Sequence, residues 1–346
     1  MSEAEQSVAV YVVAVISICC SLSILCTAAL FPIMRRKLFF QIICYISLAD
    51  TVGNTLYINP NRPADGSIMC SIEGFFHLYC YPVSWFWSTM LMYFLYSLAF
   101  EGKLPLSYNA IHMTCWGIPL VLTLLNLTTN SYGHASDYTK YEVCSISGNV
   151  YTGNIWHDTT YYGVWLLCVI AMIFMYCRII SLAKHELAIS VSEFQLALST
   201  MGRYPVALVV FWFPHVFFVV LSGIVPLDRR GIAYLIGVLL YILHGAGTTV
   251  IFFHHSPLTQ KLWMDALRKL AKYCCQHMTR SGEDFIFRDT GEEEFVCRDI
   301  DVDTEMYALK YEDRRVDEQL SDLQPGNIVL QNPIRTSLTD QLSTNL

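Results

Sequence analysis

Seven long apolar runs fill most of the first 255 residues and constrain the fold more than any other feature. Each approaches the roughly 20 residues that a helix needs to cross a bilayer, and none contains a lysine. The runs cover residues 8–30, 38–59, 70–100, 111–129, 161–182, 204–225 and 232–255. Only 15% of the chain is charged, against about 25% in a typical soluble domain. The pattern predicts an all-α membrane protein in which residues 8–255 form a seven-transmembrane helix bundle.

The fourth run has a proline in its middle, in "CWGIPLVLTLL". Pro119 has no N–H and clashes with the carbonyl four residues earlier, which costs a soluble helix about 3 kcal/mol. Neighbouring helices in a membrane can satisfy the freed carbonyl. The proline is therefore compatible with a membrane span packed among others.

Basic residues outside the runs lie mainly on one side of the predicted bundle. The larger group is Arg35, Arg36, Lys37, Lys103, Arg178, Lys184, Arg203, Lys261, Arg268, Lys269, Lys272 and Arg280, and the smaller group is Arg62, Lys140, Arg229 and Arg230. Cytoplasmic loops carry the excess of lysine and arginine. The chain is therefore predicted to be a multi-pass plasma-membrane protein. Its N-terminus (residues 1–7) would be extracellular and its C-terminus cytoplasmic.

Residues 256–278 follow the last run and combine an apolar face with flanking lysines and arginines. This pattern predicts an amphipathic helix that lies on the inner leaflet of the bilayer. Cys274 and Cys275 come directly after the basic residues and are candidates for palmitoylation. The alternative is a pair of ordinary cytosolic thiols.

The last segment, residues 279–346, carries a net charge of −9 and little apolar periodicity, which predicts a disordered cytoplasmic tail. Its end clusters hydroxyl residues near acids: Thr336, Ser337, Thr339, Ser343 and Thr344. Phosphates there would favour arrestin-type partners. Residues 344–346 also have the Ser/Thr-x-apolar form that PDZ grooves bind by strand addition. A solvated tail without a specific task is the alternative.

Two of the 13 cysteines are predicted to face outward. Cys70 lies at the outer end of the third run, and Cys144 lies in the longest outer loop. Because the outside is oxidising, we expect them to form a disulfide. Two free thiols remain the alternative.

Several polar residues inside the runs are candidates for function. Asp50, in "ISLADTVGN", is costly in a membrane and either binds a cation or titrates, or is a structural acid hydrogen-bonded near Asn54. Glu73 and His77 lie on one face of the third run, where Glu73 either meets a ligand or is an exposed acid at the rim, which is the favoured interpretation. The predicted ligand-pocket residues are Glu73, His77, Trp85, His215 and His244.

Pro214 lies at mid-depth in the sixth run, beside Trp212. A proline kink beside a bulky ring predicts a hinge with two packing arrangements. An ordinary kink that never moves is the alternative.

Two other classes of seven-helix protein are less compatible with the sequence. Asp50, His215 and His244 would be the ligands of a zinc hydrolase, but no H-x₃-H or H-E-x-x-H spacing is present. A retinal pigment needs a lysine inside the bundle, and the seven runs have none.

Four short segments resemble G-protein-coupled receptors, most of all the cyclic-AMP-receptor-like branch. These are "ISLAD" in the second run, Cys70 with "SWFWSTMLMYFLYSL" in the third, "CWGIPL" in the fourth and "LHGAG" in the seventh. Trp116 and Pro119, in "CWGIPL" of the fourth run, also resemble the secretin and adhesion receptors. The chain departs from rhodopsin-type receptors, since it lacks the Asp/Glu-Arg-Tyr triplet and the Asn-Pro-x-x-Tyr motif.

The resemblance implies a receptor, not an enzyme, that binds an extracellular small molecule or peptide and activates a heterotrimeric G protein. It implies a switch that comprises Asp50, Trp116, Pro119, Trp212 and Pro214. The implied contacts to the G protein are Lys103, Arg178, Lys184, His185 and Arg203. We expect no cofactor, no metal and no nucleic-acid partner. A membrane hydrolase or transporter is the alternative function.

Overall fold

The computed structural model describes residues 3–58, 63–100, 106–129, 131–134, 144–146, 155–186, 202–224 and 232–281. It is mostly helical and divides into two compact units. One unit comprises Met1–Tyr96 with Leu106–Asp265, and the other comprises Ser97–Pro105 with Ala266–Leu346. The sites described below lie in the first unit.

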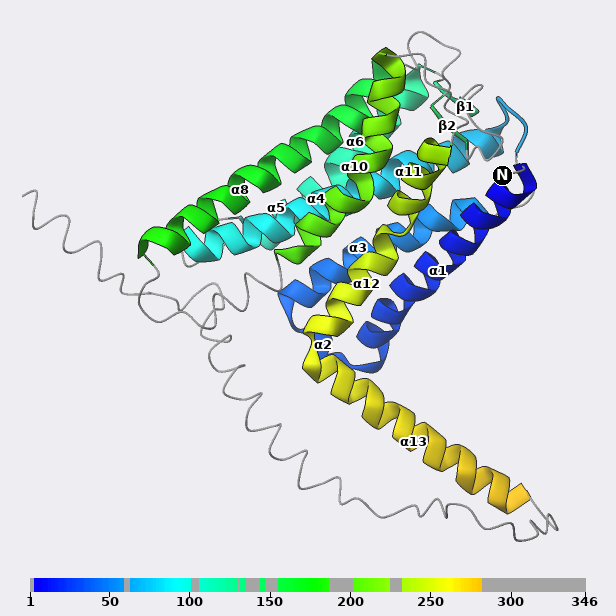
Figure 1. Cartoon of the computed structure of the whole chain (residues 1–346), viewed down its shortest axis with the longest axis vertical. Coiled ribbons are helices and arrows are strands. Elements are labelled where there is room, and N and C mark those ends of the chain that lie inside the picture. Colours follow the sequence, from blue (N-terminus) through cyan, green and yellow to red (C-terminus); the bar gives the residue numbers. More distant parts are fainter. Residues whose placement is uncertain are drawn as a thin grey trace, which may run out of the picture. The chain divides into compact units, whose positions relative to one another are not determined.

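Helices occupy all seven predicted segments (Figure 1). They are α1 (Glu3–Leu30), α3 (Leu38–Thr55), α4 (Ile68–Phe100), α5 with α6 (Tyr108–His112 and Ile118–Thr128), α8 (Val164–Glu186), α10 (Arg203–Ile224), and α11 with α12 (Ile232–Ile242 and His244–His255). Shorter elements are α2 (Pro32–Arg35), the 3₁₀ turn η1 (Leu56–Ile58) and the π-helical turns η2 (Met113–Gly117) and η3 (His157–Gly163). The segment after the bundle is α13 (Pro257–Ser281).

Three helical stretches of the described chain are long and apolar enough to cross a membrane: Ala4–Leu30, Tyr108–Thr128 and Thr159–Ser181. A fourth is the pair α11–α12, which is bent by 46° at Leu243. The chain is therefore a multi-pass membrane protein.

Several predicted boundaries shift. Helix α1 begins at Glu3, inside the segment expected to precede the bundle, because polar residues extend a helix into water without cost to burial. Helix α13 continues three residues past the expected end at position 278. The tail beyond Ser281, and with it the phosphorylation and PDZ predictions, lies outside the described residues.

The structure explains how Pro119 fits into a helix. The π-helical turn η2 ends immediately before α6, and Pro119 occupies the first turn of α6, where a missing N–H is least costly. The Thr123 hydroxyl donates a hydrogen bond to the Pro119 carbonyl at 2.7 Å. A wider turn before the proline thus accommodates it without ending the span.

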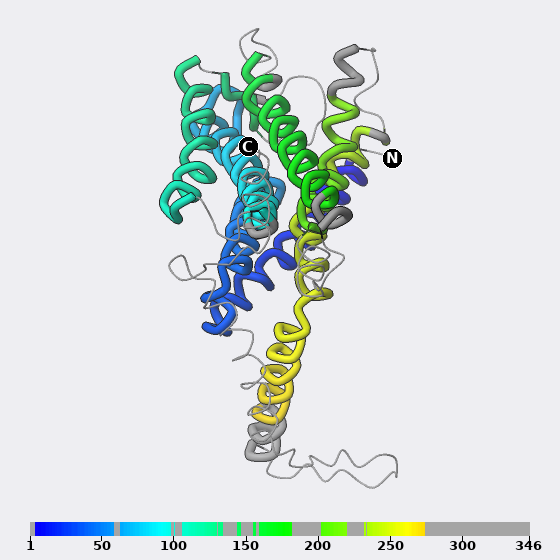
Figure 2. Tube along the Cα trace, turned by 90° about the vertical axis from the view of Figure 1, so that its left-hand side faces the viewer, coloured from blue at the N-terminus to red at the C-terminus, as the bar shows by residue number. Residues whose placement is uncertain are grey.

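Helices α1, α3 and α12 pack side by side (Figures 1 and 2). Glycine allows this approach, because a Cβ on Gly245 would lie 2.9 Å from Ser17 Oγ and closer still to Ser21 Oγ. Helix α10 approaches α11 in the same way, since a Cβ on Gly237 would lie 3.0 Å from the backbone of His215. Small residues at helix contacts are typical of membrane bundles.

A short hairpin covers the start of α4. Strands β1 (Tyr132–His134) and β2 (Cys144–Ile146) pair antiparallel. A disulfide joins Cys144 to Cys70 in the first turn of α4, as the sequence predicts. The Tyr132 hydroxyl donates to the Thr123 carbonyl at 2.8 Å, and burial raises the pKa of this phenol. The hairpin is thereby fixed to both α4 and α6.

The first residues of α13 belong to the same unit as the bundle. Trp263 donates its indole N–H to Thr27 Oγ1 at 2.8 Å, and its ring meets Phe31 edge-on. Leu258 and Leu262 pack against the buried cluster around Phe40 and Phe252. This end of α13 is anchored by packing.

Candidate functional site

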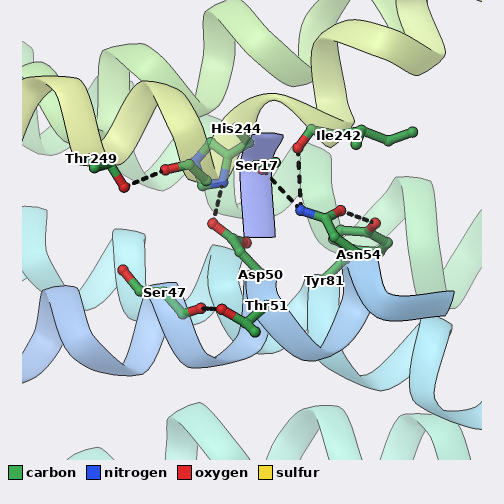
Figure 3. A network of polar contacts seen from close by, with 10 residues as sticks. Ser17, Ser47, Asp50, Thr51, Asn54, Tyr81, Ile242, His244 and Thr249 are labelled. Atoms are coloured by element: carbon green, nitrogen blue, oxygen red, sulfur yellow. Dashed lines mark hydrogen bonds and ion pairs between the residues drawn. The ribbon is translucent and has the colours of Figure 1, made fainter. Parts of the chain in front are cut away.

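Asp50 and His244 form a buried pair between α3 and α12 (Figure 3). Their side chains are 2% and 3% exposed, and His244 Nδ1 lies 2.9 Å from Asp50 Oδ2. Burial of a charge in an apolar interior is costly unless it is paired and hydrogen-bonded. The sequence predicted a carboxylate near Asn54, and the structure adds the histidine, 194 positions away in the chain.

Asn54, one turn beyond Asp50 on α3, is the centre of the adjoining hydrogen bonds (Figure 3). Its amide nitrogen donates to Ser17 Oγ at 3.0 Å and to the Ile242 carbonyl at 3.2 Å. Its amide oxygen accepts from the Tyr81 hydroxyl at 3.0 Å. We call Ser17, Asp50, Asn54, Tyr81 and His244, with the Ile242 carbonyl, the polar network.

The polar network holds both halves of the bent helix. Carbonyls in the last turn of a helix have no intrahelical partner, and Ile242 is the last residue of α11. Asn54 binds that carbonyl, while Asp50 binds His244 at the start of α12. Helix α3 therefore fixes the bend at Leu243, a feature that the sequence analysis did not predict.

Three buried oxygen atoms in or beside the polar network are still able to form a hydrogen bond. Asp50 Oδ1 and the hydroxyls of Ser21 and Ser47 are buried, with no hydrogen-bond partner among the described residues. Within those residues, no group of three His, Cys, Asp or Glu side chains is arranged to hold a metal ion. His215, the third proposed zinc ligand, contacts the ring of Tyr241 instead.

A group of large aromatic residues adjoins the polar network. Trp212 of α10 packs on Trp85 at 4.9 Å, on Tyr81 at 5.0 Å and on Tyr241 of α11 at 4.9 Å between ring centroids. Tyr161 of η3 meets Trp85 at 4.9 Å. We call Tyr81, Trp85, Tyr161, Trp212 and Tyr241 the aromatic cluster. It joins α4, α10, α11 and η3 through side chains that are almost fully buried.

His77 connects the aromatic cluster to the hairpin. Its Nε2 lies 3.0 Å from the Tyr57 hydroxyl, and its Nδ1 lies 3.5 Å from the Ser145 hydroxyl. The Tyr57 hydroxyl also bonds to the hydroxyl of Tyr241. We call Ser145, His77, Tyr57 and Tyr241 the histidine chain. It connects β2, α4, η1 and α11.

The predicted ligand-pocket residues divide between these features. Glu73, His77 and Trp85 follow one face of α4, in register with Tyr81, at a spacing of four residues. Glu73 is only 7% exposed, so the favoured interpretation as an exposed rim acid is wrong. Tyr132 and Ser145 of the hairpin lie against the neighbouring Gly74. His215 joins the group through Tyr241. His244 does not, because it pairs with Asp50.

Tyr57, Tyr161 and Tyr241 were not singled out from the sequence. The four-residue spacing along α4 points to Tyr81, but no local pattern indicates which residues of other helices meet that face. Their contacts depend on the packing of α10, α11 and η3.

The predicted switch residues lie in separate places. Pro214 lies inside α10, which remains one helix, and Trp212 is fully buried. Trp116 lies within the π-helical turn that precedes Pro119, and its ring is 6.0 Å from those of Tyr45 and Trp87 between centroids. Among the ring contacts of the described residues, none connects Trp116 of the fourth predicted span directly to Trp212.

The predicted inner contacts are only partly described. Arg203 is exposed at the start of α10 and bonds to His255, and Arg178 is exposed on α8. Lys103 lies outside the described residues. So do the side chains of Lys184 and His185 in α8 and of Cys274 and Cys275 in α13.

No established family profile matches the chain. It is similar to the protein named cyclic AMP receptor-like protein A from Dictyostelium discoideum, with 26% identity over 105 residues. The match covers 30% of this chain and 28% of that protein's length. This distant, partial similarity agrees with the resemblance given by the sequence motifs.

Proposed function

We propose that the chain is a seven-transmembrane cell-surface receptor that converts binding of an extracellular ligand into activation of a heterotrimeric G protein. The observation that carries the proposal is the similarity to a protein named as receptor-like. Helices at all seven predicted segments support it. So does the aromatic cluster, which links the α4 residues beneath the hairpin to α10.

In this proposal the N-terminus and the hairpin are extracellular, and α13 and the tail are cytoplasmic. The distribution of basic residues supports this orientation. The amphipathic sequence of α13 supports contact with the inner leaflet, with Cys274 and Cys275 as lipidation sites. The tail would bind arrestin-type or PDZ proteins.

The ligand would enter beneath the hairpin and contact Glu73, His77, Trp85 and His215. The cyclic AMP in the relative's name is not carried over to this chain, because an anionic nucleotide needs basic partners and the sequence assigns only Arg62, Lys140, Arg229 and Arg230 to the outer side. The ligand class is treated as open between a small molecule and a peptide.

Binding would shift a pre-existing equilibrium between two bundle states. Helix α10 would pivot at Pro214 as Trp212 repacks against Trp85 and Tyr241, and the polar network would hold α3 to α12 during that motion. The opened inner face would present Arg178 and Arg203 to the G protein, together with Lys103, Lys184 and His185.

The test is nucleotide exchange on a panel of purified G proteins by the full chain in lipid vesicles. Acceleration over empty vesicles, in the absence of ligand or with members of a candidate panel that includes cyclic AMP, is the expected result. No acceleration on any G protein, under any condition, would overturn the receptor proposal.

A transporter is the second candidate, and one observation favours it. Broken helices with an intramembrane carboxylate at the break form ion and substrate sites in secondary transporters, and Asp50 lies at the break between α11 and α12. Uptake of a labelled solute into sealed vesicles, abolished by Asp50→Asn, would support transport. Metal analysis of the same protein tests the zinc hydrolase.

A further inference from the structure

His77 is placed differently from an ordinary buried histidine. It is 8% exposed and lies two turns below Cys70 on α4. Both ring nitrogens face hydroxyl groups, Tyr57 at 3.0 Å and Ser145 at 3.5 Å. A hydroxyl can donate or accept a hydrogen bond. Both the neutral and the protonated imidazole can therefore be satisfied without moving either partner.

We propose that this chain senses protons, with His77 as the proton-binding site and the histidine chain as the route by which its charge reaches α10. The ligand at this site is the hydronium of the medium. Histidine is the side chain whose charge ordinarily changes between pH 5 and 8. The inference deepens the proposed receptor function, on which its signalling readout rests.

Protonation changes the direction of the hydrogen bonds. A neutral imidazole donates from one nitrogen and accepts at the other, so the histidine chain has two possible directions. A protonated imidazole donates from both nitrogens, so Tyr57 and Ser145 both accept from His77, and the Tyr57 hydroxyl hydrogen points away from the imidazole. Protonation thereby removes the arrangements in which Tyr57 or Ser145 donates to His77, and it favours the one in which Tyr57 donates to Tyr241.

The last member of the histidine chain touches the predicted switch. The Tyr241 ring stacks on Trp212 of α10 at 4.9 Å and 27°, and it also meets His215 at 4.6 Å. A change in the direction of the Tyr241 hydroxyl therefore acts on a ring that is packed against α10.

An acidic group and several aromatic rings surround His77. The titratable groups that face it are Glu73 and Tyr81 of α4, Tyr57 of η1 and Tyr161 of η3, with Tyr241 of α11 behind Tyr57. Glu73 lies one turn away on the same helix face and is also buried. The Tyr161 ring is nearly parallel to the imidazole at 6.2 Å, close to the distance of a cation–π contact.

The first experiment measures the proton site itself. Imidazole-labelled full-length chain in nanodiscs is titrated from pH 5 to 8 by NMR, and the His77 signal is the one that disappears in His77→Gln. Titration within this range is the expected result. A His77 signal that does not change would overturn the proposal.

The second experiment measures coupling without a G protein. The chain is labelled with fluorotryptophan, and the Trp212 signal is assigned by its loss in Trp212→Phe. The chemical shift of Trp212 should change with pH in the parent. The control variant is Tyr108→Phe, which removes a different hydrogen bond between tyrosine hydroxyls, from Tyr108 to Tyr45 at 3.2 Å, and its Trp212 signal should change in the same way. It should not follow pH in His77→Gln or Tyr57→Phe. A Trp212 signal that ignores pH in the parent, or follows it equally in Tyr57→Phe, would overturn the relay.

The third experiment measures signalling. The ratio of exchange rates for parent and His77→Gln cancels the pH dependence of the G protein, and we expect it to change about threefold or more between pH 7.5 and 5.5. A constant ratio in an active receptor overturns proton sensing and leaves the proposed function intact. Absence of exchange at every pH overturns the proposed function, and the two spectroscopic experiments then still decide the proton site.

Discussion

Two of the buried histidines among the described residues, His244 and His77, differ in their partners. His244 Nδ1 faces one carboxylate oxygen, Asp50 Oδ2, at 2.9 Å. His77 faces hydroxyls on both sides and accepts either charge state. The Asp50–His244 pair is therefore a fixed tie between α3 and α12, whereas the hydroxyl partners of His77 can either donate or accept a hydrogen bond.

The largest expected effect is a loss of stability when the Asp50–His244 pair is broken. Asp50→Ala leaves the buried His244 without its carboxylate, and removing one member of a buried pair costs about 3–5 kcal/mol of unfolding free energy. Denaturant unfolding of the purified protein in detergent measures this. His77→Gln is the matched comparison, because glutamine can still bond to Tyr57, so its cost should be about 1 kcal/mol.

A double-mutant cycle makes that test specific. Asp50→Asn combined with His244→Gln should cost less than the sum of the single changes, since residues in contact couple. Equal costs for Asp50→Ala and His77→Gln would contradict the distinction between the two histidines.

Removing the Cys70–Cys144 disulfide should give the second largest loss of stability. The structural change should be confined to the region around His77 and should not reach the Asp50–His244 pair. Cys70→Ala should lower stability by about 2–5 kcal/mol, since removing the crosslink frees the unfolded chain. Cys144→Ala and the double variant should match it. Hydrogen exchange should rise in β1, β2 and the start of α4, and not in α3 or α12. Free thiols at both positions in the unreduced protein would contradict the bridge.

The sequence was sufficient for the positions of the helices, because the length and apolarity of a run decide whether it can span a bilayer. It did not predict the bend at Leu243, since the break contains no proline and is held by Asn54 and Asp50 from another helix. The burial of Glu73 was missed for a similar reason. Residues distant in the chain cover it, and no local pattern encodes that packing.

Individual site residues were recognised more readily than their partners. Asp50 and His244 were each singled out, yet nothing in the sequence joined them to each other rather than to a zinc ion with His215. The four-residue spacing from Glu73 to Trp85 shows one face of α4, but the rings of Tyr241 and Trp212 reach it only through the packing of α10 against α11.

A smaller effect is expected at Pro214, between the two histidine regions. Pro214→Ala restores a backbone N–H and removes a helix-breaking residue, so the bundle should fold. Signalling should fall, because a shift of about 1.4 kcal/mol between two bundle states changes their ratio tenfold. Nucleotide exchange normalised to surface expression measures it. Parental signalling by the variant would rule out the hinge.

The smallest effect concerns Tyr81, which touches both regions. Its hydroxyl donates to Asn54 in the polar network, and its ring meets His77 edge-on at 5.1 Å. Tyr81→Phe removes the hydrogen bond and keeps the ring, so stability should fall by about 1 kcal/mol. The pH response of Trp212 should remain, because the histidine chain runs through Tyr57 and does not need the Tyr81 hydroxyl. The fluorotryptophan titration measures the response, and thermal unfolding measures the stability. A variant that loses the pH response at unchanged stability would mean that proton binding at His77 is transmitted through Asn54 to the Asp50–His244 pair. The Asp50–His244 pair and His77 would then act as one coupled unit.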